Sequence, residues 1–320
     1  MLPPPFLIDQ QDRVSTAGSC FAQHIARTLS ARGFGYLVTE PGPPEEGYGL
    51  YPARFGNIYT VRQLRQTFQR AYGLFVPVDD AWRVADHWVD PFRPGVQAGG
   101  FASREALIGD RDSHMAAVRA MFETSDVFIF TLGLTEAWMD ARTGAVVPLA
   151  PGVVGAEAAE DDYVFHNFTV QETIDDLLAF IDEVRLLSPT LRIILTVSPV
   201  PLIATFEDRH VLQATTYSKS VLRVAAETAR TLREGVVYFP SYEIVTGAHN
   251  RARFFEDDMR NVRPEGVSRV MATFSRHFLS SEDGVAPPAR TFAPQEPVRD
   301  HLAEHRALAD VVCDEEAIER

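Results

Sequence analysis

Cysteine is scarce in this chain, and the signals that mark several common classes of protein are missing. Two cysteines, Cys20 and Cys313, lie near opposite ends of the 320 residues, which excludes a disulfide framework and a cysteine metal cluster. No apolar run has the length that a membrane-spanning helix needs. The first residues have neither the basic region nor the apolar run of a signal peptide. We therefore expect a cytoplasmic protein without a membrane span.

The chain also lacks a basic stripe, a glycine-rich phosphate loop and closely spaced histidines. Its net charge is −14, and an acidic chain without clustered Lys and Arg does not favour nucleic acid as a partner. His87 and His114 stand far apart, so no metal site is predicted, and no cofactor is expected. The hydrophobic fraction of 46% over 320 residues is enough for one large globular core.

Four short, continuously apolar runs are predicted as buried parallel strands, because strands covered on both faces lack the alternation of half-exposed ones. Helical periodicities separate them, and the last helix begins at Pro264. This alternation predicts an α/β fold with a doubly wound, mostly parallel sheet flanked by helices in a three-layer sandwich. The predicted strands are residues 13–17, 126–132, 192–197 and 236–239, with a weaker fifth at 35–39, and the other predicted helices include 113–124, 169–187 and 210–232.

The strand–helix rhythm predicts a single domain over residues 1–280. Two excursions, 41–100 and 138–167, interrupt the rhythm and are expected to form a cap, with a hairpin around residues 140–144 in the second. From residue 281 onward the chain becomes rich in proline and charge. Residues 281–320 are therefore predicted to be a C-terminal tail.

Ser19 is the residue that most clearly suggests chemistry. It follows the first predicted strand and precedes a helix with Phe21, Ile25 and Leu29 on one face. The amides and dipole at a helix start favour negative charge, which suits a nucleophile that builds an oxyanion. The alternative is that Ser19 only caps the helix. The neighbouring Cys20 is expected to be a small buried residue, because adjacent side chains diverge.

Four ordered motifs resemble those of a known family. The run that begins at Gly18 has the sequence Gly-Ser-Cys-Phe-Ala, after which the GSCFA family is named, and residues 131–138, 196–201 and 238–243 resemble its later landmarks. This family is similar to the SGNH hydrolase superfamily of esterases, lipases and carbohydrate O-acyl transferases or esterases. The resemblance implies an SGNH-type fold with Ser19 as the nucleophile.

The same resemblance implies an oxyanion hole built from three loops. Backbone amides beside the nucleophile, including that of Cys20, form one part. A glycine of a second loop forms another, and Gly56 is the candidate for it. An asparagine in a Gly-x-Asn-Asp run completes the hole in the superfamily. Here the run that begins at Gly133 occupies that place and has Thr135 instead of asparagine. Asn57 is the alternative source of the missing amide.

The superfamily's general base is absent from its usual place. SGNH enzymes carry Asp-x-x-His just before the last helix. Asp258 matches the aspartate, but Asn261 stands where the histidine belongs. An asparagine amide cannot take a proton from serine near neutral pH. One hypothesis is therefore that hydrolysis has been lost and that the pocket only binds.

Two other hypotheses keep the chemistry. In the first, His166 near the end of the second excursion folds over the nucleophile and acts as base, with His114 and His249 as weaker choices. Asp258 or Glu136 then orients it. In the second, Glu136 or Asp258 is itself the base, which requires a dry pocket and a raised pKa.

These patterns favour a serine esterase or O-acyl transferase. The resemblance implies a small acyl ester on a carbohydrate as the substrate. The alternatives are a non-catalytic module on the same fold that binds a glycan or a protein, and a structural partner protein that uses its aromatic excursions. The sequence indicates no particular oligomeric state.

Overall fold

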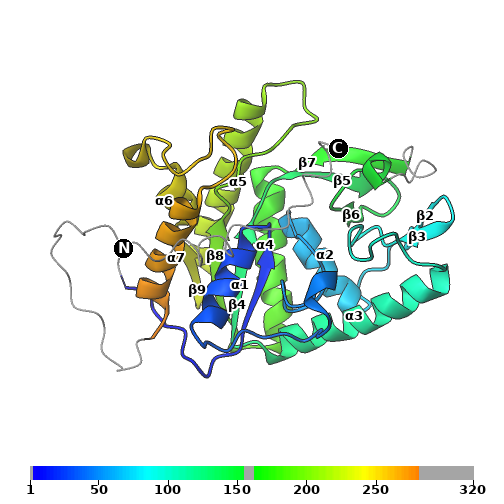
Figure 1. The fold of residues 1–320 in the computed structure, drawn as a ribbon, viewed down its shortest axis with the longest axis horizontal. Helices are drawn as coiled ribbons and strands as arrows, with labels where there is room; N and C mark the ends of the chain where they lie inside the picture. Colours follow the sequence, from blue (N-terminus) through cyan, green and yellow to red (C-terminus); the bar gives the residue numbers. More distant parts are fainter. Residues whose placement is uncertain (1–2, 155–161, 281–320) are drawn as a thin grey trace.

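A four-stranded parallel sheet forms the centre of the computed structural model, which describes residues 3–154 and 162–280. The strands are β1 (Val14–Gly18), β4 (Val127–Leu132), β8 (Arg192–Val197) and β9 (Val236–Phe239), in the order β1-β4-β8-β9. Helices flank this sheet (Figure 1). The four strands and the α/β fold predicted from the apolar runs are confirmed.

The central strand β4 shows why its sequence is continuously apolar. All six of its residues are buried. Phe128 and Phe130 pack into one hydrophobic cluster, while Val127 and Ile129 pack into another. Because successive side chains of a strand point to opposite faces, both faces of the sheet must be covered.

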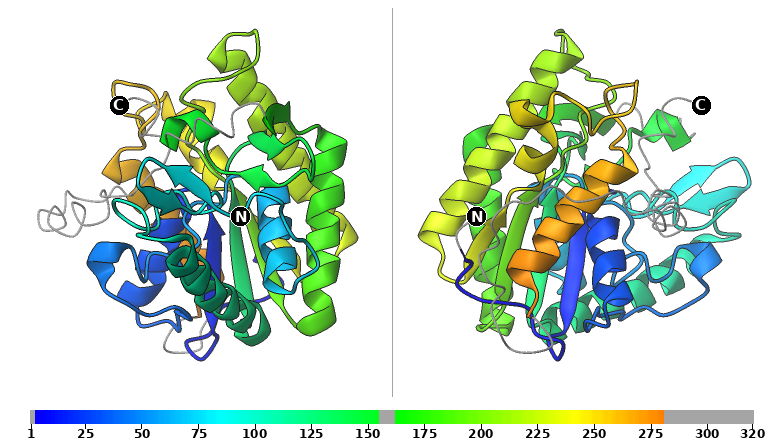
Figure 2. Two further views of the ribbon diagram at one scale, coloured as in Figure 1. Left: turned by 90° about the vertical axis from the view of Figure 1, so that its right-hand side faces the viewer. Right: turned by 60° about the vertical axis from the view of Figure 1, so that its left-hand side comes forward.

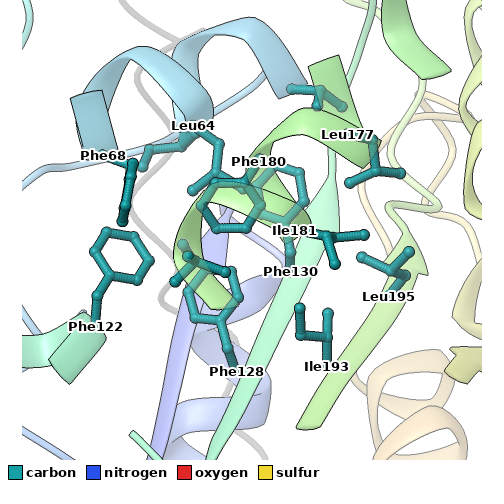
Figure 3. Packing of buried hydrophobic residues seen from close by; sticks show 14 of the residues in the cluster. Leu64, Phe68, Phe122, Phe128, Phe130, Leu177, Phe180, Ile181, Ile193 and Leu195 are labelled. Atoms are coloured by element: carbon teal, nitrogen blue, oxygen red, sulfur yellow. The ribbon is translucent and has the colours of Figure 1, made fainter. Parts of the chain in front are cut away.

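The helices divide between the two faces. α1 (Ala22–Ala31) and α7 (Pro264–Phe278) share one cluster with the sheet, and the short α6 (Ser241–Thr246) packs against α7. On the other face lie α2 (Val61–Ala71), α3 (Arg104–Thr124), α4 (Val170–Leu187) and α5 (Val211–Leu232) (Figures 1 and 2). Phe122 and Phe180 contact Phe128 there, and Phe68 contacts both of them (Figure 3).

Local sequence signals fix several of these boundaries. Thr169 caps α4 with its side chain, and Glu172 completes a capping box. α3 begins at Arg104, well before residue 113, because Ser103 accepts a hydrogen bond from the Ala106 amide. The fifth predicted strand is wrong: Tyr36 forms only an isolated bridge to β1.

The two excursions form structure of their own. The first contains the 3-10 helix η1 (Pro44–Glu46), the core helix α2 and a hairpin of β2 (Trp82–Val84) and β3 (His87–Val89). In the second, β5 (Glu136–Asp140), β6 (Val146–Val147) and β7 (Tyr163–Asn167) form an antiparallel sheet, and the hairpin predicted around residues 140–144 is confirmed as the β5–β6 turn. Two further 3-10 helices are η2 (Pro151–Val154) and η4 (Ala248–Asn250).

The predicted tail at 281–320, with Cys313 in it, lies outside the described residues. Within 3–154 and 162–280, no helix combines the length and the apolar character that crossing a membrane requires.

Candidate active site

The turn after β1 depends on a glycine. Gly18 has φ +136°, and a Cβ atom there would lie 2.3 Å from the carbonyl oxygen of Thr131 on β4. Only glycine adopts this conformation and approach without strain. The chain therefore leaves the sheet sharply at Gly18, and Ser19 stands between the end of β1 and the start of α1.

Ser19 is buried but its hydroxyl is unsatisfied. The residue is 4% exposed, and its Oγ atom has no hydrogen-bond partner. It does not cap α1, because the N-cap residue is Phe21 and no side chain caps this helix. A buried hydroxyl without a partner costs free energy of folding. The capping interpretation of Ser19 is therefore excluded, and its hydroxyl is left without a structural partner.

A small pocket, called here the Ser19 pocket, lies beyond the carboxyl ends of the strands, where ligands bind in doubly wound sheets. Gly133 packs closely against Ser19 and Tyr59 in this pocket. A Cβ atom at Gly133 would be 3.3 Å from the Cβ atom of Ser19 and 3.0 Å from the Tyr59 carbonyl oxygen. The pocket is lined by Ser19 and Cys20 after β1, Gly133 and Leu134 after β4, Ser198, Val200, Pro201 and Leu202 after β8, and Tyr59 and Lys219.

Lys219 is the functional candidate that the sequence patterns did not reveal. It lies on α5, is 2% exposed, and donates a hydrogen bond from Nζ to the Gly133 carbonyl oxygen at 2.6 Å. Lysine is almost never fully buried unless it is paired. One signal was available in the sequence: Lys219 is the single lysine of a chain whose other basic residues, apart from histidine, are all arginine.

The histidines named from the sequence do not line the Ser19 pocket. His166 lies on β7, with Nε2 2.9 Å from a carboxylate oxygen of Glu172 and its ring 4.7 Å from that of Phe168. His114 is buried on α3, where its Nδ1 lies 2.7 Å from a carboxylate oxygen of Glu40. Burial lowers the pKa of His114 to about 4, although the Glu40 contact acts to raise it. His249 is exposed on η4.

The two predicted carboxylates also lie outside the Ser19 pocket. Glu136 accepts hydrogen bonds from the hydroxyl of Thr205 at 2.7 Å and from the amide of Phe206 at 3.4 Å, and burial raises its pKa. Asp258 accepts from the backbone and side-chain amides of Asn261 at 2.9 and 2.7 Å. Burial acts to raise the pKa of Asp258, but these and neighbouring hydrogen bonds hold it below its usual value.

Asp258 and Asn261 line a separate cavity in an exposed loop, and this cavity shares only Pro201 and Leu202 with the Ser19 pocket. The aspartate holds the asparagine side chain through the contacts above. Asp258 therefore binds an asparagine side chain, which has no basic nitrogen.

Three groups predicted as oxyanion donors, the Thr135 hydroxyl and the amides of Ser19 and Gly133, are engaged in other contacts. The Thr135 hydroxyl donates to the side-chain oxygen of Asn167 at 2.6 Å. The amides of Ser19 and Gly133 donate to the carbonyl oxygens of Thr131 and Tyr59, at 3.2 and 3.1 Å. These groups hold the nucleophile turn and the β4 loop together.

Gly56 and Asn57 line a second cavity rather than the Ser19 pocket. Asn57 is buried, and its side-chain oxygen accepts a hydrogen bond from the Tyr51 hydroxyl at 2.6 Å. The next amide, that of Ile58, donates to the Gly18 carbonyl oxygen at 2.9 Å. This loop therefore supports the turn that presents Ser19.

The protein is an α/β protein with a central parallel sheet and a buried serine at the carboxyl end of its first strand. The GSCFA family model matches residues 13–274, and the chain belongs to the GSCFA family. Among solved structures it is similar to a family 3 carbohydrate esterase of Clostridium thermocellum, with a TM-score of 0.36 and 10% identity over 93% of this chain and 98% of the other. No curated protein matches the chain.

Proposed function

We propose that this protein is a serine esterase or O-acyl transferase with Ser19 as its nucleophile. The observation that carries the proposal is the unpartnered, buried Oγ of Ser19 in a pocket that also holds the amine of Lys219. A serine hydroxyl needs a nearby base to attack an ester, and Ser–Lys pairs fill this role on other folds. The family resemblance described above supports the same class of reaction.

Lys219 is the base in this proposal. Burial disfavours the charged form of a lysine in general, which is how catalytic lysines come to accept protons near neutral pH. Nζ contacts the Gly133 carbonyl oxygen. Gly133 in turn lies so close to Ser19 that an added Cβ atom would be 3.3 Å from the Cβ atom of Ser19. A catalytic hydrogen bond that is open without substrate closes when the substrate binds. No other strong base lines the pocket among the described residues.

The reaction proceeds in two steps, acylation of Ser19 and deacylation. Ser19 Oγ attacks the ester carbonyl carbon and gives its proton to neutral Lys219, and the resulting tetrahedral oxyanion collapses and expels the alcohol, which takes the proton from Lys219. The acyl group then remains on Ser19. Water or a second alcohol attacks this acyl-enzyme, with Lys219 again taking and returning one proton, and Ser19 is regenerated.

The oxyanion forms beside the first turn of α1. The positive end of the helix dipole and the backbone amide of Cys20 face this region in our proposal, as they would in any nucleophile turn that opens a helix. Thr135 and Asn57 act on the site indirectly, through Asn167 and the Gly18 turn. The carbohydrate ester implied by the family resemblance is the proposed substrate.

Ester hydrolysis tests the proposal directly. Initial rates on p-nitrophenyl acetate and on an acetylated oligosaccharide are compared for the wild type, Ser19→Ala and Ser30→Ala. Ser30 is an exposed serine on the same helix. We expect Ser19→Ala to lower kcat/KM by about a thousandfold or more, as loss of a nucleophile does, and Ser30→Ala to match the wild type. An unchanged rate in Ser19→Ala overturns the proposal.

A second candidate function is a non-catalytic module that binds an acylated glycan. Asn261 in the place of the superfamily histidine favours it, as does the engagement of the Ser19 and Gly133 amides within the protein. Calorimetric titration with the acetylated oligosaccharide separates the two functions. Binding by the wild type without any release of acetate supports the module, whereas release of acetate that depends on Ser19 supports the enzyme.

A further inference from the structure

An apolar cavity, called here the β5–β7 cavity, adjoins the Ser19 pocket. Tyr59, Leu134 and Leu202 line both spaces. The empty space between its lining residues is about 720 Å³, which includes the solvent at its open side. Its walls come from the antiparallel sheet of the second excursion and from residues 202–206 after β8.

The walls of the cavity are mostly apolar, and their polar residues include Thr60, Gln63 and Glu136. Val146, Val147 and Leu149 contribute aliphatic side chains. Trp138 and Phe206 contribute aromatic rings whose centroids are 5.1 Å apart. Phe165 joins them at 5.6 Å from Phe206 and 6.0 Å from Trp138. Surfaces of this kind bind aliphatic or aromatic groups and offer little to a hydroxylated sugar ring edge.

The exposure of one wall residue indicates that this cavity is open to a ligand and is not a closed part of the core. Phe206 is 57% exposed although it belongs to the aromatic wall. Exposed apolar surface at the rim of a hollow typically marks a binding site. Glu136 also lines the cavity, but its carboxylate is held by Thr205 and the Phe206 amide, which fixes the loop that carries Phe206.

Resting on the proposed function, we propose that the β5–β7 cavity binds the acyl chain of the substrate, and that this chain is a neutral hydrophobic chain longer than acetyl. The ester carbonyl then lies at Ser19, and the chain passes between Leu134 and Leu202 into the cavity. A carboxylate of Glu136 at the wall disfavours an acyl chain that ends in a second negative charge.

Two positions offer a matched pair of variants. Ala150, in the loop after β6, lines the cavity and is half-buried, so Ala150→Trp fills the space. Val164 neighbours Phe165 on β7 and is exposed on the opposite face of the strand, and it does not line the cavity. Val164→Trp therefore adds the same side chain to a strand that borders the cavity without filling the cavity. Melting temperatures of both variants establish that they are folded.

The experiment measures kcat/KM for p-nitrophenyl acetate, butyrate and hexanoate. Each buried methylene is worth up to about a fourfold gain, so we expect the wild type to prefer hexanoate over acetate by at least tenfold. Ala150→Trp is expected to lower this hexanoate-to-acetate ratio by at least tenfold, and Val164→Trp to leave it unchanged. Hydrolysis of acetate with no preference for hexanoate overturns the inference and leaves the proposed function intact.

Binding of 1-octanol to the Ser19→Ala protein, followed by calorimetry, examines the cavity without catalysis. We expect saturable binding that Ala150→Trp abolishes and Val164→Trp preserves. If no ester is hydrolysed but octanol binds in this way, the proposed function fails and the apolar site stands. If octanol does not bind, or binds equally to Ala150→Trp, the apolar site is overturned.

Discussion

Lys219 and Gly133 are joined by a hydrogen bond of 2.6 Å from the lysine Nζ to the glycine carbonyl oxygen. Gly133 in turn lies so close to Ser19 that a methyl group added to it would be in tight contact with the serine side chain. The bond thus ties the middle of α5 to the loop after β4, beside the nucleophile. It brings the chain's one amine side chain to the wall of the Ser19 pocket.

The first prediction concerns this amine. Lys219→Arg keeps a donor for the Gly133 carbonyl but cannot act as a base, because arginine does not lose its proton in proteins. Lys219→Met removes both properties. We expect both variants to lower kcat by about a hundredfold or more, and to lose the rise of kcat/KM with pH that a lysine base gives the wild type.

Rates measured from pH 5 to pH 10, with circular dichroism to check folding, decide the role of Lys219. Near wild-type turnover in Lys219→Arg would mean that the residue only holds the Gly133 loop. In that case the base in our mechanism is wrong.

The second prediction concerns His166, the base suggested by the sequence. Its ring contacts Glu172 and Phe168 rather than the Ser19 pocket. We therefore expect His166→Ala to hydrolyse p-nitrophenyl acetate within about threefold of the wild-type rate. Its free energy of unfolding should fall by at most about 1 kcal/mol, as for a half-exposed side-chain contact. A hundredfold loss of kcat in a folded variant would restore His166 as the base.

The third prediction concerns the position of the missing histidine. Asn261 lies in an exposed loop, where Asp258 binds its side chain and a different cavity adjoins it. A histidine there would meet the same aspartate without entering the Ser19 pocket. We expect Asn261→His to change kcat/KM by less than about threefold. A large gain in esterase activity would instead identify a decayed site that needs only its former base.

The fourth prediction is a dependence of stability on pH. Burial lowers the pKa of His24 to about 3 and that of His114 to about 4, whereas both titrate near 6.5 in an unfolded chain. The unfolded state therefore binds more protons as the pH falls from about 6.5 toward 4, and stability declines in this window. Each histidine contributes a slope of up to about 1.4 kcal/mol per pH unit.

Urea unfolding at several pH values between 7 and 4.5 measures this slope. His24 packs edge-on against Phe21, so His24→Phe removes one titrating group and keeps an aromatic ring in place. We expect the variant to have a shallower decline than the wild type. Identical slopes would show that His24 does not stay neutral in the folded protein.

The sheet could be predicted from the sequence because its strands are buried on both faces. Runs such as Val127–Leu132 are apolar at every position except Thr131, and this pattern does not depend on distant contacts. The segment at 35–39 has a similar composition but forms a single bridge through Tyr36. Whether a segment joins a sheet edge depends on the path of the loops around it, which local composition does not determine.

The site could be predicted only in part. Ser19 was identified from local signals, because a glycine, a serine and a helix start are neighbours in sequence. Lys219 was missed because a lysine in an amphipathic helix is normally solvated, and its burial follows from how α5 packs above the β4 loop. His166 and Phe165 alternate along β7, and only the docking of that strand decides which of them faces a cavity.

Labelling with a fluorophosphonate, read by intact mass and peptide mapping, tests the central claim most directly. An activated serine beside an oxyanion site reacts with this probe, whereas an ordinary buried hydroxyl does not. The account predicts one adduct, on Ser19, and a strong decrease in labelling rate in Lys219→Arg. A folded wild-type protein that takes up no probe, or an adduct on Cys20, would contradict the assignment of Ser19 as the nucleophile.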